Sequence, residues 1–138
     1  MKKNSFSWIA FIVLQTGLLE QAQVVTDDSQ LVSAIQNRRS LSFLQAAQLT
    51  VTQVLPDDNV GLKHQKFVVQ TSRAQSVMIV YNLDLCPRVP VRVGDRVAVG
   101  GEFIWSGRSA LVHWTHYDPQ SRRPSGYIYH NNLAYCYR

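Results

Sequence analysis

The chain has 138 residues, of which 46% are hydrophobic and 17% are charged. This length holds one domain, and this composition is that of a globular protein, so both a multidomain chain and an intrinsically disordered one are excluded. The formal net charge of +5 at pH 7 is compatible with a polyanionic partner, although solvated surface charge explains most excesses of this size.

The first 23 residues have the pattern of a secretory signal peptide. Lys2 and Lys3 precede the apolar run 8–14, and Ala22 is a small residue suited to cleavage. The apolar stretch is shorter than the about 20 residues that span a bilayer comfortably. An uncleaved anchor is the alternative, because Glu20 is unfavourable three positions into a cleavage site. We expect a periplasmic or secreted protein with no stable membrane span after cleavage.

Residues 24–42 are expected to form a short helix followed by a linker. Apolar residues recur at helical spacing between Leu31 and Ile35, after the acidic pair 27–28 and before the basic pair 38–39. An acidic start and a basic end suit the dipole of a helix.

Residues 43–138 carry successive strand patterns and are expected to form the folded domain. Apolar and polar residues alternate in five segments that end at turn-forming residues. The expected strands cover residues 43–55, 63–69, 77–81, 97–105 and 110–116, and one or two short strands follow between 127 and 137. Gly100-Gly101 is where the fourth strand is expected to bend or bulge.

Five strands without an interior helix indicate an all-β fold. We expect a small five-stranded OB-like barrel, named after the oligonucleotide/oligosaccharide-binding fold, preceded by the short helix and the signal peptide. The segment 93–102 resembles the turn and fourth strand of that fold. A two-sheet sandwich is the alternative.

Export determines how the two cysteines are interpreted. Cys86 and Cys136 in an oxidising compartment most simply form one disulfide, and two separate buried thiols are the alternative. The bridge would close a loop of about 50 residues and stabilise the fold by about 4 kcal/mol in the chain-entropy model.

A polar cluster near the end of the fifth strand is the candidate site. Its candidate catalytic residues are His113, His116, Asp118 and His130. In an extended strand, side chains separated by an odd number of residues point to opposite faces. His113 and His116 therefore converge only if the strand ends or bulges near Thr115.

Several chemical uses are open to this cluster. Two imidazoles could transfer protons, while Arg88, Arg122 or Arg123 holds an anionic substrate by forked hydrogen bonds. Trp114 could stack on a base or a sugar. The donor atoms would suit zinc, but their spacing matches no recognised zinc signature, and we expect neither a metal nor another cofactor. The structural alternative is that the cluster hydrogen-bonds loop backbones, since Asp118 before proline commonly starts a turn.

Four segments resemble an uncharacterised bacterial family of small exported proteins, catalogued as a domain of unknown function. These segments are His64–Phe67, Asn82–Pro90, His113–Pro119 and His130–Asn131, and the similarity covers nearly all of the chain after residue 44. The chain departs from the family pattern, which usually has histidine at positions 81 and 117, alanine at 86 and His-Pro-Asp-Gly-Trp at 123–127.

The resemblance implies a barrel with a shared polar site and brings no known activity. It places the shared polar site at His64, Asn82, Arg88, His113, His116, Asp118 and His130. With the aromatic and basic residues above, the candidate ligand-binding set is His64, Asn82, Arg88, Trp114, Arg122 and Arg123.

Two functions from different classes therefore stand. The first is a cell-envelope binding module for a polyanionic ligand, either nucleic acid or a glycan. The second is an exported hydrolase, a nuclease or a phosphodiesterase, that uses His113, His116 and His130. An inert structural or inhibitor-like role is a third option. The sequence leaves open whether the protein is an enzyme and what its oligomeric state is.

Overall fold

The computed structural model describes residues 25–138, so the expected signal peptide and its alternative, an uncleaved anchor, lie outside the described residues. In the described part, no helix is long and apolar enough to cross a membrane. The described elements are one helix and seven strands: α2 (Ser29–Gln36), β1 (Leu41–Asp58), β2 (His64–Gln70), β3 (Ser76–Asn82), β4 (Arg96–Trp105), β5 (Ala110–His113), β6 (Tyr127–His130) and β7 (Leu133–Tyr135).

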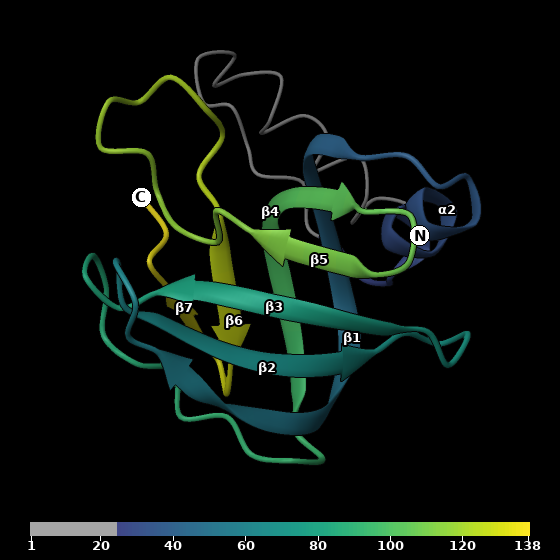
Figure 1. Cartoon of the computed structure of the whole chain (residues 1–138), viewed down its shortest axis with the longest axis horizontal. Coiled ribbons are helices and arrows are strands. Elements are labelled where there is room, and N and C mark those ends of the chain that lie inside the picture. Colours follow the sequence, from purple (N-terminus) through teal and green to yellow (C-terminus); the bar gives the residue numbers. More distant parts are fainter. Residues whose placement is uncertain (1–24) are drawn as a thin grey trace, which may run out of the picture.

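The first five strands close into a ring of backbone hydrogen bonds (Figure 1). Around the ring the order is β1-β2-β3-β5-β4, and β4 pairs with β1 again. The pairs are antiparallel except for β3 and β5, which run parallel. This closed ring confirms the all-β, OB-like fold predicted from the sequence, since a sandwich would keep two separate sheets.

The strands β6 and β7 form a hairpin that extends the sheet beyond the ring. β4 pairs with β6 through 98–100 and with β5 through 102–105, so it changes partner at Gly101. A Cβ on Gly101 would lie 2.5 Å from the carbonyl oxygen of His113, and one on Gly100 would lie 2.5 Å from the ring of Tyr127. Both glycines therefore permit close approach by neighbouring strands.

The register irregularities lie in β1 and not at the paired glycines of β4. Against β4, the register of β1 shifts between Leu41 and Leu44 and again between Ala46 and Leu49. The sequence predicted a bend or a bulge at Gly100-Gly101. Figure 1 shows that β4 bends along its length, and no register shift of β4 marks a bulge.

The core lies inside the ring and is built from alternate residues of each strand. In β3, for example, Val77, Ile79 and Tyr81 are buried, while the residues between them are half-buried on the outer face. The helix adds Leu31 and Ala34 to the same core. Apolar burial of this kind is the main term that stabilises the folded state.

The Asp28 carboxylate attaches the helix to the ring. The sequence pattern predicted instead that this carboxylate interacts with the dipole of the helix. Asp28 immediately precedes α2 but makes no side-chain capping hydrogen bond. Its two oxygens instead accept hydrogen bonds from the backbone N–H and the hydroxyl of Ser72, at 2.6 and 2.9 Å. Ser72 lies in the turn between β2 and β3, so α2 packs at that end of the hairpin.

Cys86 and Cys136 form a disulfide, as predicted from the sequence, with Cα atoms 5.7 Å apart. The bridge joins the loop after β3 to the segment after β7. Buried hydrogen bonds fix the same loop, because the Gln65 side chain donates to the Val89 carbonyl and accepts from the Val89 N–H. Tyr81 donates its hydroxyl hydrogen to the Pro87 carbonyl, and burial, with a smaller contribution from Tyr135, raises the pKa of Tyr81 to about 12.

Candidate functional site

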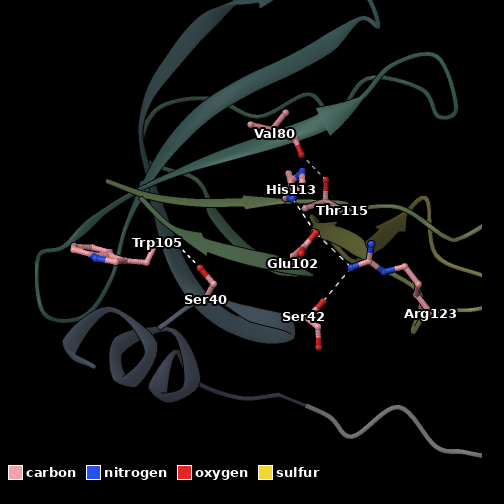
Figure 2. A network of polar contacts seen from close by, with 8 residues as sticks. All are labelled: Ser40, Ser42, Val80, Glu102, Trp105, His113, Thr115 and Arg123. Atoms are coloured by element: carbon pink, nitrogen blue, oxygen red, sulfur yellow. Dashed lines mark hydrogen bonds and ion pairs between the residues drawn. The ribbon is translucent and has the colours of Figure 1, made fainter. Parts of the chain in front are cut away.

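The fifth strand ends earlier than its sequence pattern predicts, and this early end shapes the site. β5 stops at His113, so the predicted strand 110–116 is three residues too long. Trp114 adopts φ 56°, in the left-handed region that a bulky residue seldom occupies. Thr115 then donates its hydroxyl hydrogen to the Val80 carbonyl at 2.8 Å, which keeps the chain beside β3 after the strand has ended (Figure 2).

The end of β5 creates a pocket of about 230 Å³ on the outer face of the ring. It lies where β2 begins and where the parallel strands β3 and β5 both end, at the opposite end of the β2–β3 hairpin from Ser72. The lining residues are Leu62, His64, Val80, Asn82, His113, Trp114 and His116. Because Trp114 interrupts the alternation of the strand, His113 and His116 line one pocket instead of facing opposite sides.

His113 lies at one end of a series of polar contacts that begins on β4. Glu102 is its partner across the β4–β5 pair, and the carboxylate Oε1 lies 3.0 Å from His113 Nε2. The oxygen lies off the N–H direction of the ring, so the contact is an ion-pair contact and not an aligned hydrogen bond. Arg123 Nη2 lies 3.4 Å from the same oxygen and donates to the Ser42 carbonyl (Figure 2).

His116 has one ring nitrogen committed to the backbone. Its Nδ1 lies 2.6 Å from the carbonyl oxygen of Tyr117. A carbonyl oxygen can only accept a hydrogen bond, so the hydrogen of the neutral imidazole is on Nδ1 and Nε2 carries the lone pair. The residue is 7% exposed.

The ring of Trp114 is already in contact with two neighbours. The Arg123 guanidinium lies 4.3 Å from its centroid, and the His116 ring lies 4.7 Å away, tilted by 35°. Such a cation–π contact fixes the indole in the pocket wall. The sequence analysis predicted that Trp114 could stack on a ligand. In the structure, Arg123 and His116 already contact its ring.

The backbone beneath the pocket is packed tightly against Gly126. A Cβ on Gly126 would lie 2.1 Å from the Trp114 carbonyl oxygen and 2.7 Å from the His116 nitrogen. The Gly126 N–H donates to the His116 carbonyl at 2.9 Å, and the Tyr117 N–H donates to the Cys136 carbonyl at 2.8 Å. Only glycine fits at this position without moving the chain.

His130, a candidate catalytic residue, lies outside the pocket. It is 2% exposed on β6, and its Nε2 lies 2.8 Å from Asp95 Oδ2. Asp95 also accepts the backbone N–H of Arg92, and these hydrogen bonds, with that from His130 the larger, lower the pKa of Asp95. The Nδ1 of His130 is buried without a partner among residues 25–138. His130 thus contacts a carboxylate inside the protein and not a loop backbone, as the structural alternative had it.

Asp118, the fourth catalytic candidate, closes a turn and is not a lining residue of the pocket. Its two oxygens accept the backbone N–H groups of Gln120 and Arg122, each at 2.9 Å. These two hydrogen bonds, named in order of size, lower the pKa of Asp118. The predicted ligand-binding residue Arg122 contributes its backbone to this turn and does not line the pocket.

The remaining ligand-binding candidates divide between the pocket and the rest of the surface. His64 and Asn82 are paired across β2 and β3 and both line the pocket, where the Asn82 side chain also accepts the Asp84 N–H at 2.8 Å. Arg88 is outside it and forms an ion pair with Asp57. Arg123 reaches the pocket wall through Trp114.

The pocket thus gathers three imidazoles, an indole and an amide around an apolar wall. Within the described part of the chain, no three His, Cys, Asp or Glu side chains are grouped closely enough to hold a metal ion. The imidazoles and the amide can both accept and donate hydrogen bonds.

Sequence reasoning missed Glu102, Leu62 and Val80. Glu102 has a visible signal, since it is an acidic residue on the outward parity of a strand rich in valine. Its pairing with His113 depends on the register between β4 and β5, which local patterns do not contain.

One of three comparisons with known proteins identifies a family for this chain. No curated protein and no solved structure matches the chain. A family model described as "Protein of unknown function (DUF3465)" matches residues 12–136. Since the match spans most of the sequence, the chain belongs to this family of unknown function.

Proposed function

We propose that this protein is an exported binding module of the cell envelope and that its ligand is single-stranded nucleic acid. The observation that carries the proposal is the pocket at the ends of β3 and β5, where His64, His113, His116 and Trp114 meet on the outer face of the ring. In OB folds the face of strands 2 and 3 takes up oligonucleotides and oligosaccharides. Export rests on the sequence pattern of the first 23 residues.

The size of the pocket favours one unit of a polymer as its occupant. Sites for whole drug-sized ligands measure about 300–1,000 Å³, whereas this pocket holds about 230 Å³. Planar rings dominate its walls, and planar rings complement nucleobases, which proteins without sequence preference bind by stacking and by charge. This composition favours nucleic acid over an anionic glycan.

Positive charge lies beside the pocket on the same face. Lys66 shares the outward parity of β2 with His64 and pairs across the sheet with Val80, a lining residue. Arg123 lies behind Trp114. A strand of phosphates crossing this face would meet Lys66, while the base or sugar of one nucleotide enters the pocket.

The test is the salt dependence of binding to a fluorescently labelled single-stranded DNA oligonucleotide. We expect the logarithm of the affinity to fall linearly with the logarithm of the salt concentration, because phosphate contacts release counterions. Lys66→Ala should weaken binding and reduce the magnitude of that slope by about 1. Arg73→Ala is the matched control, since it removes one positive charge from the turn at the far end of the β2–β3 hairpin.

The outcomes separate the ligand classes. Binding of heparin but not of DNA would mean that the ligand is an anionic glycan and not nucleic acid. Failure to bind either polymer at low salt would remove the proposal. Equal losses in Lys66→Ala and Arg73→Ala would show that binding reflects overall charge and not this face.

The alternative function predicted from the sequence is a hydrolase that uses His113, His116 and His130. His130 is buried against Asp95, away from the pocket lining. His113 and His116 remain as the pair that shares a pocket, and their chemistry is taken further below.

A further inference from the structure

We propose that the pocket also cleaves RNA, with His116 as general base, His113 as general acid and Glu102 as the residue that positions His113. This inference rests on the proposed function, since the substrate must first bind across the pocket as a single-stranded polymer. The supporting observations are the two different ways in which the protein holds the two imidazoles.

His116 is held so that it can take up a proton. Its Nδ1 donates to the Tyr117 carbonyl at 2.6 Å, which leaves the lone pair on Nε2. The ring lines the pocket, and Nε2 is neither hydrogen-bonded nor among the fully buried polar atoms of the described residues. A backbone carbonyl that fixes the tautomer in this way leaves the opposite nitrogen as a general base.

His113 is held so that it can give up a proton. The Glu102 carboxylate lies 3.0 Å from Nε2, so this nitrogen is the one that the protein occupies. The other nitrogen, Nδ1, is left to donate to a substrate oxygen. The charged and titratable groups around His113 are Glu102 on β4, Arg123 in the loop before β6, and His64 and His116 in the pocket.

The walls of the pocket point to RNA as the substrate. Its lining residues include no serine, threonine or cysteine that could attack phosphorus. The neighbouring hydroxyl of Thr115 already donates to the Val80 carbonyl. The nucleophile must therefore come from the substrate or from water, and a vicinal hydroxyl attacks far faster than a free water molecule because it is already in position. RNA carries that hydroxyl and DNA lacks it.

The step balances without a further reactant. His116 Nε2 takes the proton of the ribose 2′-hydroxyl as its oxygen forms a bond to phosphorus. The bond between phosphorus and the 5′-oxygen of the next nucleotide breaks, and His113 protonates that leaving oxygen. The products are a 2′,3′-cyclic phosphate and a free 5′-hydroxyl. Exchange of protons with water then restores both imidazoles.

The experiment compares a labelled single-stranded RNA with a DNA of the same sequence. We expect the protein to bind both and to cleave the RNA alone, with 2′,3′-cyclic phosphate ends detected by mass spectrometry. Intact RNA together with bound DNA would overturn this inference and leave the proposed function standing. Failure to bind either polymer would overturn both. Cleavage of DNA at a similar rate would exclude the 2′-hydroxyl as nucleophile and overturn the inference.

Two substitutions preserve the structural contacts while removing the proton-transfer nitrogens. In His116→Asn the side-chain amide can still donate to the Tyr117 carbonyl, and in His113→Gln an amide can still reach Glu102. Each should lower the cleavage rate by roughly 100-fold or more, with a melting temperature close to that of the parent. Arg73→Ala, purified identically, should cleave at the parental rate. Cleavage that persists in both histidine variants would identify a contaminating nuclease and overturn the inference.

Glu102 is tested by separating kcat from KM. It faces His113 across the β4–β5 pair and is not a lining residue of the pocket, so Glu102→Gln should lower kcat for RNA cleavage with KM close to the parental value, and Glu102→Asp should restore part of kcat. A purely structural role would also lower the melting temperature of Glu102→Gln. An unchanged kcat would remove Glu102 from the mechanism.

Discussion

His130 and the two pocket histidines His113 and His116 lie in opposite environments within one small sheet. His130 is 2% exposed on β6, and its hydrogen-bonded nitrogen serves Asp95 in the turn before β4. His113 and His116 lie at the end of β5, where each has one nitrogen held by the protein and the ring lines a pocket. Burial encloses His130 in its contact with Asp95, which we call the clamp, whereas His113 and His116 line a cavity.

The difference teaches that clustering in the sequence is a weak guide to clustering in space. The sequence analysis placed His130 and His113 in one site because both belong to the polar cluster in the last third of the chain. The fold sends β6 to the β4 edge beyond β5, so the imidazole of His130 meets Asp95 instead of the pocket. His64, almost fifty positions before His113, is the residue that joins it.

The largest expected effect comes from the disulfide, which links the two regions. Cys86 follows the strand that ends at the pocket, and Cys136 follows the hairpin that carries His130. Replacing both cysteines by serine should lower the free energy of unfolding by about 4 kcal/mol in the chain-entropy model. Urea denaturation at pH 7 measures the loss. A change below about 1 kcal/mol would mean that packing alone holds the two regions together.

The second prediction compares the histidines directly. His130→Ala should destabilise the fold by about 3 kcal/mol, because it leaves a cavity in place of a buried ring and removes one of the hydrogen bonds to Asp95. His113→Ala should cost less than about 1 kcal/mol, because that side chain is partly exposed at a pocket. Both are measured by urea denaturation, and each is the control for the other. Equal costs would abolish the distinction between clamp and pocket.

The smallest effect is a pH dependence of the clamp. The pKa of Asp95 lies below its usual 3.8 in the folded state, chiefly through the hydrogen bond from His130. The ionised carboxylate therefore stabilises the fold above the usual value, and this stabilisation is lost as the pH falls through the lowered pKa. The stability difference between the parent and Asp95→Asn should thus be present at pH 6 and shrink towards pH 2.

The double variant assigns this pH dependence to its cause. In a His130→Ala background, Asp95→Asn should change stability less than it does in the parent, because the first of the two hydrogen bonds that lower the pKa is already gone. An unchanged effect would assign the stabilisation to the Arg92 N–H alone. Thermal melts between pH 2 and pH 7 supply the measurement.

Local sequence patterns were sufficient for the fold. Alternation through residues such as Val77, Ile79 and Tyr81 marks buried strand faces, and the oxidising compartment inferred for Cys86 and Cys136 led to their pairing. These signals depend on neighbours in the chain, or on a simple count, and the structure agrees with them.

The site could be predicted only in part, because its decisive contacts are set by strand register and by one backbone angle. The left-handed turn at Trp114 follows from the contact of Thr115 with Val80, thirty-five positions earlier. The pairing of Glu102 with His113 follows from the register of β4 and β5. Neither is encoded by spacing within a segment. Asp118 is the opposite case, since its turn is local and the sequence offered it as the structural alternative.

The glycine at position 126 has a consequence for any molecule that enters the cavity. Because its missing side chain lets the backbone of Trp114 and His116 settle against it, the floor of the cavity has no room to shift downward. A guest would therefore meet a floor that is already packed, and little affinity would be lost to rearranging it.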